Sequence, residues 1–246
     1  LFRSSIAIAV GLVLWVGPLS AAPDSLLGIS FSGDPSRKGT SVPLQILLLL
    51  SVLTLLPAIV MCLTPFLRIT LVLHFLRQAL GTQTAPSNQI LIGLALFLTM
   101  LIVRPMVDEI YKTSWEPMEK GKITTVQALD IASKPLKQFL LHFARQKDLR
   151  LFLELSHSPS PVSPNDLSLS VVIPAYILSE LQTGFQIGAI LYLPFLVIDL
   201  VVASITLSVG MVQLPPVMVS APFKILLFVL VDGWNLVVGS LVKSFG

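Results

Sequence analysis

The 246-residue chain has few charges and one cysteine, and each shortage excludes a class of protein. Charged residues make up 12% of the sequence, against roughly 25% in soluble domains. The single cysteine, Cys62, allows neither an internal disulfide nor a zinc cage of cysteines. The net charge of +3 is small and scattered, which argues against a nucleic-acid partner. With 54% hydrophobic residues, the chain is expected in a membrane or covered by other subunits.

The sequence also lacks the motifs of common catalytic sites. It contains no P-loop, G-x-G-x-x-G, H-E-x-x-H or G-x-S-x-G pattern. His74, His142 and His157 are far apart and do not have the spacing of metal ligands. The sequence therefore predicts no enzyme, no metal site and no cofactor.

Residues 1–22 have the pattern of an export signal. Arg3 precedes an apolar run at residues 6–19, and small residues follow at Ser20, Ala21 and Ala22. An uncleaved membrane anchor is the alternative. Either reading sends the chain to the membrane and leaves residues 23–43, rich in Gly, Ser and Asp, as an extracytoplasmic segment.

Further apolar blocks occupy residues 44–67, 90–103, 185–209 and 216–242. The first is long enough to span a bilayer, with Pro57 and Pro65 expected to kink or end it. The second is short of the roughly 20 residues that a span needs. The last two contain Asp199 and Lys224, so we expect helices packed inside an assembly rather than helices surrounded by lipid.

Most of the charged residues lie between these blocks, at residues 108–184. Thr124 and Gln127 fit a capping box that starts a helix, and Pro135 is expected to restart a second one. No strand alternation occurs, so the sequence predicts an all-α fold. Apolar helical hairpins resembling transmembrane segments are expected at 44–107 and 185–246, with a polar helical domain inserted at 108–184. Arg68 and Arg77, in an expected loop at 64–88, place that loop on the cytoplasmic side.

Asp199 and Lys224 carry charge within the last apolar hairpin. A turn at residues 210–216, centred near Val212, brings residue 199 opposite residue 225, so the two charges lie at one depth. A charge at a bilayer centre costs roughly 2.5–3.5 kcal/mol, and we therefore expect a buried pair. Asp232 has no charged partner across the hairpin. It is expected either to contact another subunit or to mark the solvated end of the buried region.

Glu180 is the only charge in the helical stretch at residues 171–185. A lone acid on an apolar helix requires a cation, and Arg145 of a neighbouring protomer is the expected partner, ahead of Lys147. Phe139, on an apolar helical face, is a further candidate for contact between subunits. A solvated Glu180 is the alternative.

Four long stretches, at residues 65–99, 174–190, 194–211 and 221–234, resemble the FliP/SctR family. These proteins are the P subunits of the type III protein-export gate of flagella and virulence injectisomes. The resemblance covers nearly the whole chain after residue 22. The export signal and the sequence VDGW at residues 231–234 favour the flagellar branch over an injectisome subunit. It implies a pentamer that assembles with the Q and R subunits into a helical pore for unfolded export substrates. It also implies the A-type gate protein and B-type switch protein as neighbours, in the inner membrane and flagellar basal body, with much of the assembly raised toward the periplasm.

The resemblance also implies a methionine-rich gate loop between the last two helices. Met211, Val212 and Gln213 occupy the matching positions. Methionine suits a seal because its side chain is flexible and polarizable, but Gln213 departs from that chemistry. An ordinary Gly/Pro hairpin turn is the alternative. Two other functions stay open on the sequence: a small ion-coupled transporter using Asp199 and Lys224, and a scaffold that lines no pore.

Overall fold

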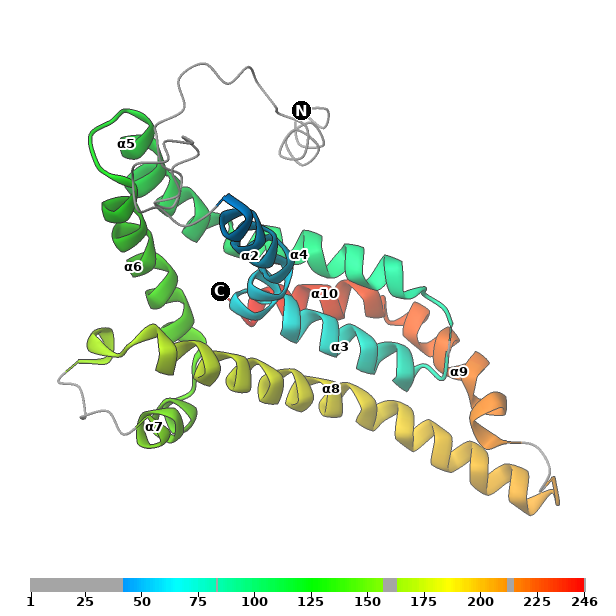
Figure 1. Ribbon diagram of the computed structural model, residues 1–246. Coiled ribbons are helices and arrows are strands. Elements are labelled where there is room, and N and C mark those ends of the chain that lie inside the picture. Colours follow the sequence, from blue (N-terminus) through cyan, green and yellow to red (C-terminus); the bar gives the residue numbers. More distant parts are fainter. Residues whose placement is uncertain (1–41, 83, 157–162, 212–214, 246) are drawn as a thin grey trace. The chain divides into compact units, whose positions relative to one another are not determined.

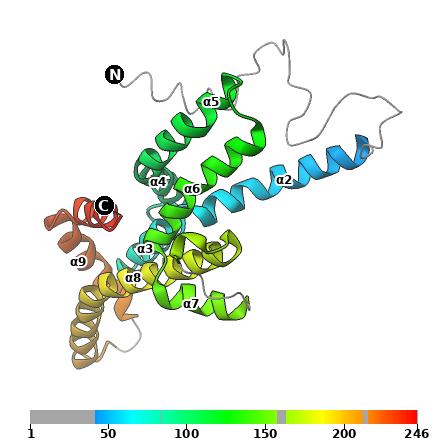
Figure 2. The same ribbon diagram turned by 90° about the vertical axis from the view of Figure 1, so that its left-hand side faces the viewer.

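The computed structural model describes residues 42–82, 84–156, 163–211 and 215–245, and every regular element in these ranges is helical (Figures 1 and 2). The predicted all-α class is thereby confirmed. The predicted signal at residues 1–22, nearly all of the 23–43 segment, and Val212 and Gln213 lie outside the described residues. The chain divides into two units, Leu1–Thr54 and Leu55–Gly246. The described part of the first unit is the beginning of one helix, and the second unit contains every site considered below.

The first apolar block forms α2 (Val42–Leu63), and a second helix, α3 (Phe66–Ala79), begins where the block ends. Pro57 lies inside α2. Pro65 directly precedes α3, a position at which the missing N–H of proline costs no helical hydrogen bond. The predicted loop at 64–88 is therefore wrong over most of its length. The cytoplasmic assignment of this segment depends on Arg68 and Arg77 as loop charges. Arg68 is buried within α3, so the assignment loses its basis.

Helix α3 lies at the centre of the larger core. Its apolar residues recur every three or four positions, and Ile69, Val72, Leu73 and Leu76 are among those that are fully buried. The rest of this core comes from neighbouring helices and from both ends of α3: Phe66, Ala79, Leu80, Leu91, Ala95, Leu98, Phe195, Phe228, Val237 and Leu241. Helix α3, which lies in the segment predicted as a loop, is thus the element around which the other helices pack.

Helix α4 (Asn88–Ile110) continues without a gap into a π-helical turn (Tyr111–Trp115) and α5 (Glu116–Glu119). Together they make a continuous helix of 32 residues that is apolar enough to cross a membrane. The predicted short block ending before Arg104 is therefore wrong. The exposed Arg104 side chain lies 3.8 Å from the carboxylate of Asp108, one turn further along the helix. The arginine therefore lies on the helix surface, and the helix continues past it.

The polar region contains α6 (Thr125–Phe143), α7 (Gln146–Leu155) and a short 3₁₀ turn (Pro164–Asp166). Both hydrogen bonds of the Thr124–Gln127 capping box are present, as predicted. The predicted helix break at Pro135 is absent, because α6 runs through this buried proline. A second, smaller core joins these elements to the start of α8 through Leu140, Ala144, Leu167, Val171, Val172 and Tyr176.

Helix α8 (Leu169–Ser208) has 40 residues and is about 60 Å long at 1.5 Å per residue. It runs through the predicted domain boundary after residue 184, so the polar region and the last hairpin share one rigid element (Figure 1). Gly184 and Gly188 lie where α3 packs against it. A Cβ atom at these glycines would lie 2.8 Å from Leu71 and 2.4 Å from Phe75. This small-residue spacing lets the two helices approach closely.

The chain ends with α9 (Pro216–Leu230) and α10 (Gly233–Lys243), which meet at an angle of 66°. Asp232, at the bend, has φ 51° and ψ 49°, a left-handed conformation that aspartate tolerates better than most residues. Among the described residues, two helices are long and apolar enough to cross a membrane. The number rises to four if the bent pairs α2–α3 and α9–α10 each count as one span.

Candidate functional site

The α8–α9 hairpin carries a buried ion pair between its two helices. The Lys224 Nζ atom lies 2.5 Å from the Asp199 carboxylate. The lysine side chain is 1% exposed and that of Asp199 21% exposed. The structure thus brings together the two charges that the hairpin register placed opposite each other, and it does so within one chain.

Two further hydrogen bonds fix this pair in place. The Ser220 hydroxyl donates to the other Asp199 oxygen at 2.5 Å. Lys224 also donates to the backbone carbonyl of Ala79 at 3.1 Å, at the last residue of α3. A cation at a helix C-terminus satisfies an otherwise unpaired carbonyl and complements the helix dipole. Lys224 therefore ties α3, α8 and α9 together.

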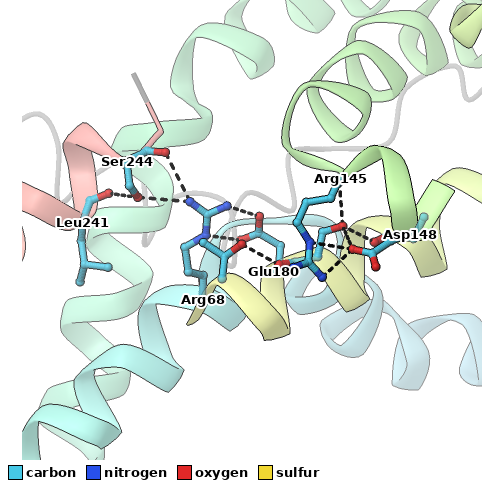
Figure 3. Close-up of polar contacts among 9 residues, drawn as sticks. Arg68, Arg145, Asp148, Glu180, Leu241 and Ser244 are labelled. Carbon is cyan, nitrogen blue, oxygen red and sulfur yellow. Dashed lines mark hydrogen bonds and ion pairs between the residues drawn. The ribbon is translucent and has the colours of Figure 1, made fainter. Parts of the chain in front are cut away.

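A second buried ion pair joins α3 to the middle of α8 (Figure 3). Arg68 donates through Nη2 and Nε to the two Glu180 oxygens at 2.5 and 2.9 Å, a bidentate arrangement. The side chains are 4% and 0% exposed. The expected partner of Glu180, Arg145 of another protomer, is therefore wrong: Glu180 is enclosed within its own chain and already paired.

The remaining guanidinium nitrogen of Arg68 faces the end of α10. It lies 3.2 Å from the Ser244 hydroxyl oxygen and 3.4 Å from the Ser244 carbonyl oxygen. The Arg68 guanidinium carbon also lies 3.9 Å from the centre of the Phe245 ring, close enough for a cation–π contact. One arginine thus links α3, α8 and the C-terminal residues.

Arg145 has its own partner one helical turn away (Figure 3). Its guanidinium lies 2.7 Å from the carboxylate of Asp148, and its backbone N–H donates to the Ser179 hydroxyl at 2.9 Å. The Ser179 hydroxyl lies 2.7 Å from the same Asp148 oxygen. Because Ser179 directly precedes Glu180 on α8, the two charge clusters are neighbours, each separately neutralised.

The other candidates for contact between subunits lie in less enclosed places. Phe139 is half-buried and packs edge-to-face on Phe143, with ring centres 5.0 Å apart. Asp232 is exposed and accepts a hydrogen bond from Asn235 at 3.1 Å. The solvated alternative for Asp232 agrees with this position, and its role between subunits stays a prediction.

The turn after α8 is described up to Met211. Gly210 has φ 81°, and the N–H groups of Gly210 and Met211 bond to the carbonyls of Leu207 and Thr206. This is a Schellman motif, which ends the helix by satisfying its last carbonyl groups. The Met211 side chain is 45% exposed. The tip of the hairpin therefore presents an apolar, deformable side chain beyond the end of a long helix.

Beyond the ion pair, the hairpin surface is apolar. A groove of about 470 Å³ lies between α8 and α9, and the side chains that line it, apart from Thr206, are hydrophobic. They are Val197, Ile198, Val201, Val202, Ile205, Thr206, Val219 and Phe223. An exposed apolar surface of this extent on a single chain marks contact with lipid or with other subunits.

Known proteins are similar in sequence to this chain over most of its length. The sequence model of the FliP family matches residues 49–241. This chain belongs to the FliP family. A Bacillus subtilis relative, "Flagellar biosynthetic protein FliP", is 48% identical over 222 residues, which cover 90% of this chain and 100% of the relative. Proteins of the same name from Pectobacterium carotovorum and Caulobacter vibrioides are 45% and 42% identical over 94% and 98% of this chain, and over 92% and 90% of their own lengths.

Sequence reasoning missed Arg68 and the helix that carries it. The predicted loop includes this residue, yet Arg68 lies three residues after Pro65, at the start of a run in which apolar residues recur every three or four positions. The Gly184–Gly188 spacing on α8 was a second available signal, since small residues four apart indicate close helix packing.

Proposed function

We propose that this chain is a pore-forming core subunit of the flagellar type III export gate, through which unfolded flagellar substrates cross the inner membrane. Its place in flagellum biogenesis and protein transport rests on membership of the FliP family. The relatives reported above carry flagellar names, which favours this branch over an injectisome subunit. The pore itself is inferred from the α8–α9 hairpin.

The hairpin's electrostatics carry the proposal. Its internal acid, Asp199, is neutralised by Lys224 in the same chain. What remains outside is largely apolar, including Leu200, Ile205 and Leu207 on α8. Copies of such a hairpin arranged side by side would bring their apolar tips into a ring. A narrow apolar ring excludes water and ions until a substrate enters.

We further propose that this ring is a pentamer built with the Q and R subunits of the gate. The A-type gate protein and the B-type switch protein would flank it in the basal body. Mass measurement of the complex purified from the membrane tests this stoichiometry directly. A mass that requires a different number of copies of this chain would contradict the pentamer.

Chemical protection at Met211 tests the pore. Cys62 is the only cysteine, so Cys62→Ser gives a background in which Met211→Cys carries the sole thiol. Met100→Cys, on the exposed surface of α4, is the matched control. A thiol lining the pore should react with maleimide in the resting gate and be shielded by a stalled export substrate. The thiol at position 100 should react equally in both states.

The result separates a pore from a scaffold. If the stalled substrate shields neither thiol, although export is blocked and the complex is assembled, the chain holds other subunits without lining the channel. Shielding of both thiols equally would indicate general occlusion of the complex, and would also count against a pore at this hairpin.

A further inference from the structure

Three basic side chains project from α3 and α9, and only one of them lacks a counter-charge. Arg68 is paired with Glu180 and Lys224 with Asp199. Arg77, near the end of α3, has no carboxylate within 4.0 Å among the described residues. This half-buried cation therefore stands without an acid in a region where the other two each have one.

The partners of Arg77 are all neutral. Its guanidinium donates to the Asn88 side-chain oxygen at 2.5 Å and to the Pro86 carbonyl at 3.4 Å. It also lies 3.1 Å from His74 Nδ1. Arginine has only donors, so His74 Nδ1 must be the acceptor in this contact. The proton of a neutral His74 ring is then on Nε2, which makes that nitrogen a second donor.

These groups open into a cavity of about 440 Å³ at the end of the α3–α4 hairpin. Its lining is His74, Arg77, Gln78, Gly81, Thr82, Tyr192 and Val217. No lining residue is acidic, and the side chains of Arg77, His74, Gln78 and Tyr192 all offer donors. Donors around a fixed positive charge suit an anion with several oxygen atoms.

Exposed apolar residues lie close in the sequence to the residues that line this cavity: Leu193 follows Tyr192, and Met218 follows Val217. Ile90 of α4, Leu193 of α8 and Met218 of α9 are all more than half exposed. A ligand that fits both features is anionic at one end and apolar at the other. We propose that the Arg77 cavity binds the phosphate of an anionic phospholipid, whose acyl chains lie along these exposed side chains.

A phospholipid fits this setting better than a carboxylate from another protein. Basic pockets between membrane helices are typical sites for anionic headgroups. The cavity includes Gly81 and Thr82 of the turn before α4, and α4 with its continuation is long and apolar enough to cross a membrane. If α4 does cross, this end of the helix lies at headgroup depth. A bidentate arginine also matches the geometry of a phosphate.

Native mass spectrometry of the full chain, purified in detergent, tests the proposal. The probes are phosphatidylglycerol and phosphatidylcholine with identical acyl chains. The unchanged chain should retain phosphatidylglycerol at least about tenfold more tightly than phosphatidylcholine. Arg77→Gln should abolish this preference, and Arg77→Lys should keep part of it, because lysine retains the charge without the planar fork.

Arg104→Gln is the matched control. Arg104 also lies on an apolar helix, but its side chain is 76% exposed and is paired with Asp108. Its loss should leave the preference for phosphatidylglycerol unchanged. If Arg77→Gln does not fold, Tyr192→Phe and Gln78→Ala keep the arginine, and each should weaken retention of phosphatidylglycerol several-fold.

Three results would overturn the proposal. One is equal retention of the two lipids by the unchanged chain. The second is tight binding of inorganic phosphate, added alone, at the concentration at which phosphatidylglycerol binds. The third is loss of a partner subunit from the Arg77→Gln complex while lipid retention stays the same, which would identify the counter-charge as a protein carboxylate.

Discussion

Lys224 and Asp199 lie 25 residues apart in the chain and 2.5 Å apart in space. Each helix of the last hairpin thus neutralises the other's charge before any partner binds. The ammonium is nearly inaccessible, whereas the carboxylate keeps some exposure on the α8 surface. The charges inside the hairpin are therefore neutralised within the single chain, and the proposed contacts with other subunits would be made by its apolar side chains.

Breaking this pair should destabilise the chain more than removing it entirely. Lys224→Ala leaves Asp199 without its cation in an apolar setting, and removing one partner of a buried pair costs roughly 3–5 kcal/mol. Lys224→Met with Asp199→Leu removes both charges and should lose much less. The apparent Tm of the detergent-purified variants measures the difference. Lys120→Ala, at the exposed pair with Glu116, is the control and should leave Tm nearly unchanged.

Equal losses of Tm in the single and the double variant would contradict this account. Because the double variant preserves side-chain volume, the loss would then come from the absence of the ion pair itself and not from an unpaired buried charge.

Replacing Arg68 with alanine should destabilise the chain more than replacing Arg145. Arg68→Ala leaves the fully buried Glu180 unpaired, which should lower stability by roughly 3–5 kcal/mol. Arg145→Ala leaves the buried Asp148 with the Ser179 hydroxyl as a remaining hydrogen-bond partner and should cost less, roughly 1–3 kcal/mol. Phe245→Ala removes a half-buried ring that stacks on Arg68 and packs edge-to-face on Phe143, and should cost roughly 1–2 kcal/mol. Denaturation in detergent ranks the three variants.

A charge exchange between Glu180 and Arg145 discriminates further. Glu180→Arg combined with Arg145→Glu should not recover assembly, because the partner of Glu180 is Arg68 in the same chain. Recovery of assembly by this exchange would show that Glu180 pairs between protomers after all.

Gly188 should tolerate no side chain where α8 packs against α3. A Cβ there would lie 2.4 Å from the Phe75 ring, and overpacking of this kind costs roughly 1–3 kcal/mol. Gly93→Ala is the matched control, since a Cβ at this glycine of α4 meets nothing within 4 Å. That change should be neutral or stabilising by up to about 1 kcal/mol through helix propensity. Thermal unfolding of both variants tests the contrast, and equal Tm values would contradict it.

The two ion pairs show what could be predicted from the sequence. Asp199 and Lys224 flank one turn, so counting residues outward from that turn is enough to place them together. Glu180 and Arg68 are 112 residues apart. No local pattern encodes that pairing, because it depends on how α3 packs against α8. Proximity in the sequence therefore favours Arg145 as the predicted partner of Glu180.

The predicted helix ends are wrong where the prediction depends on a single residue. Arg104, Pro105 and Pro135 lie inside α4 and α6 because apolar residues continue on both sides of them and packing outweighs the local preference. Pro65 does mark a boundary, since the helix that follows begins directly after it. Pro65, Pro105 and Pro135 are the same residue type, and the tertiary contacts decide whether the helix ends or continues there.

The hairpin tip should control the leak of ions rather than the fold. Met211 is exposed beyond the Schellman turn at Gly210, and Val212 follows it in the sequence. Met211→Ala together with Val212→Ala removes apolar volume from the proposed constriction without touching either ion pair. Ion permeability of resting cells should therefore rise, while the assembled complex is recovered in normal amount.

Gln213→Met is the opposite change at the same turn. It replaces a polar side chain with a deformable apolar one and should lower the resting permeability below that of the unchanged chain. Growth at raised external salt and membrane conductance measure both variants, with Met100→Ala on the α4 surface as the control. A normal barrier in the double-alanine variant, with assembly verified, would mean that the seal is made by another subunit that fills the pore.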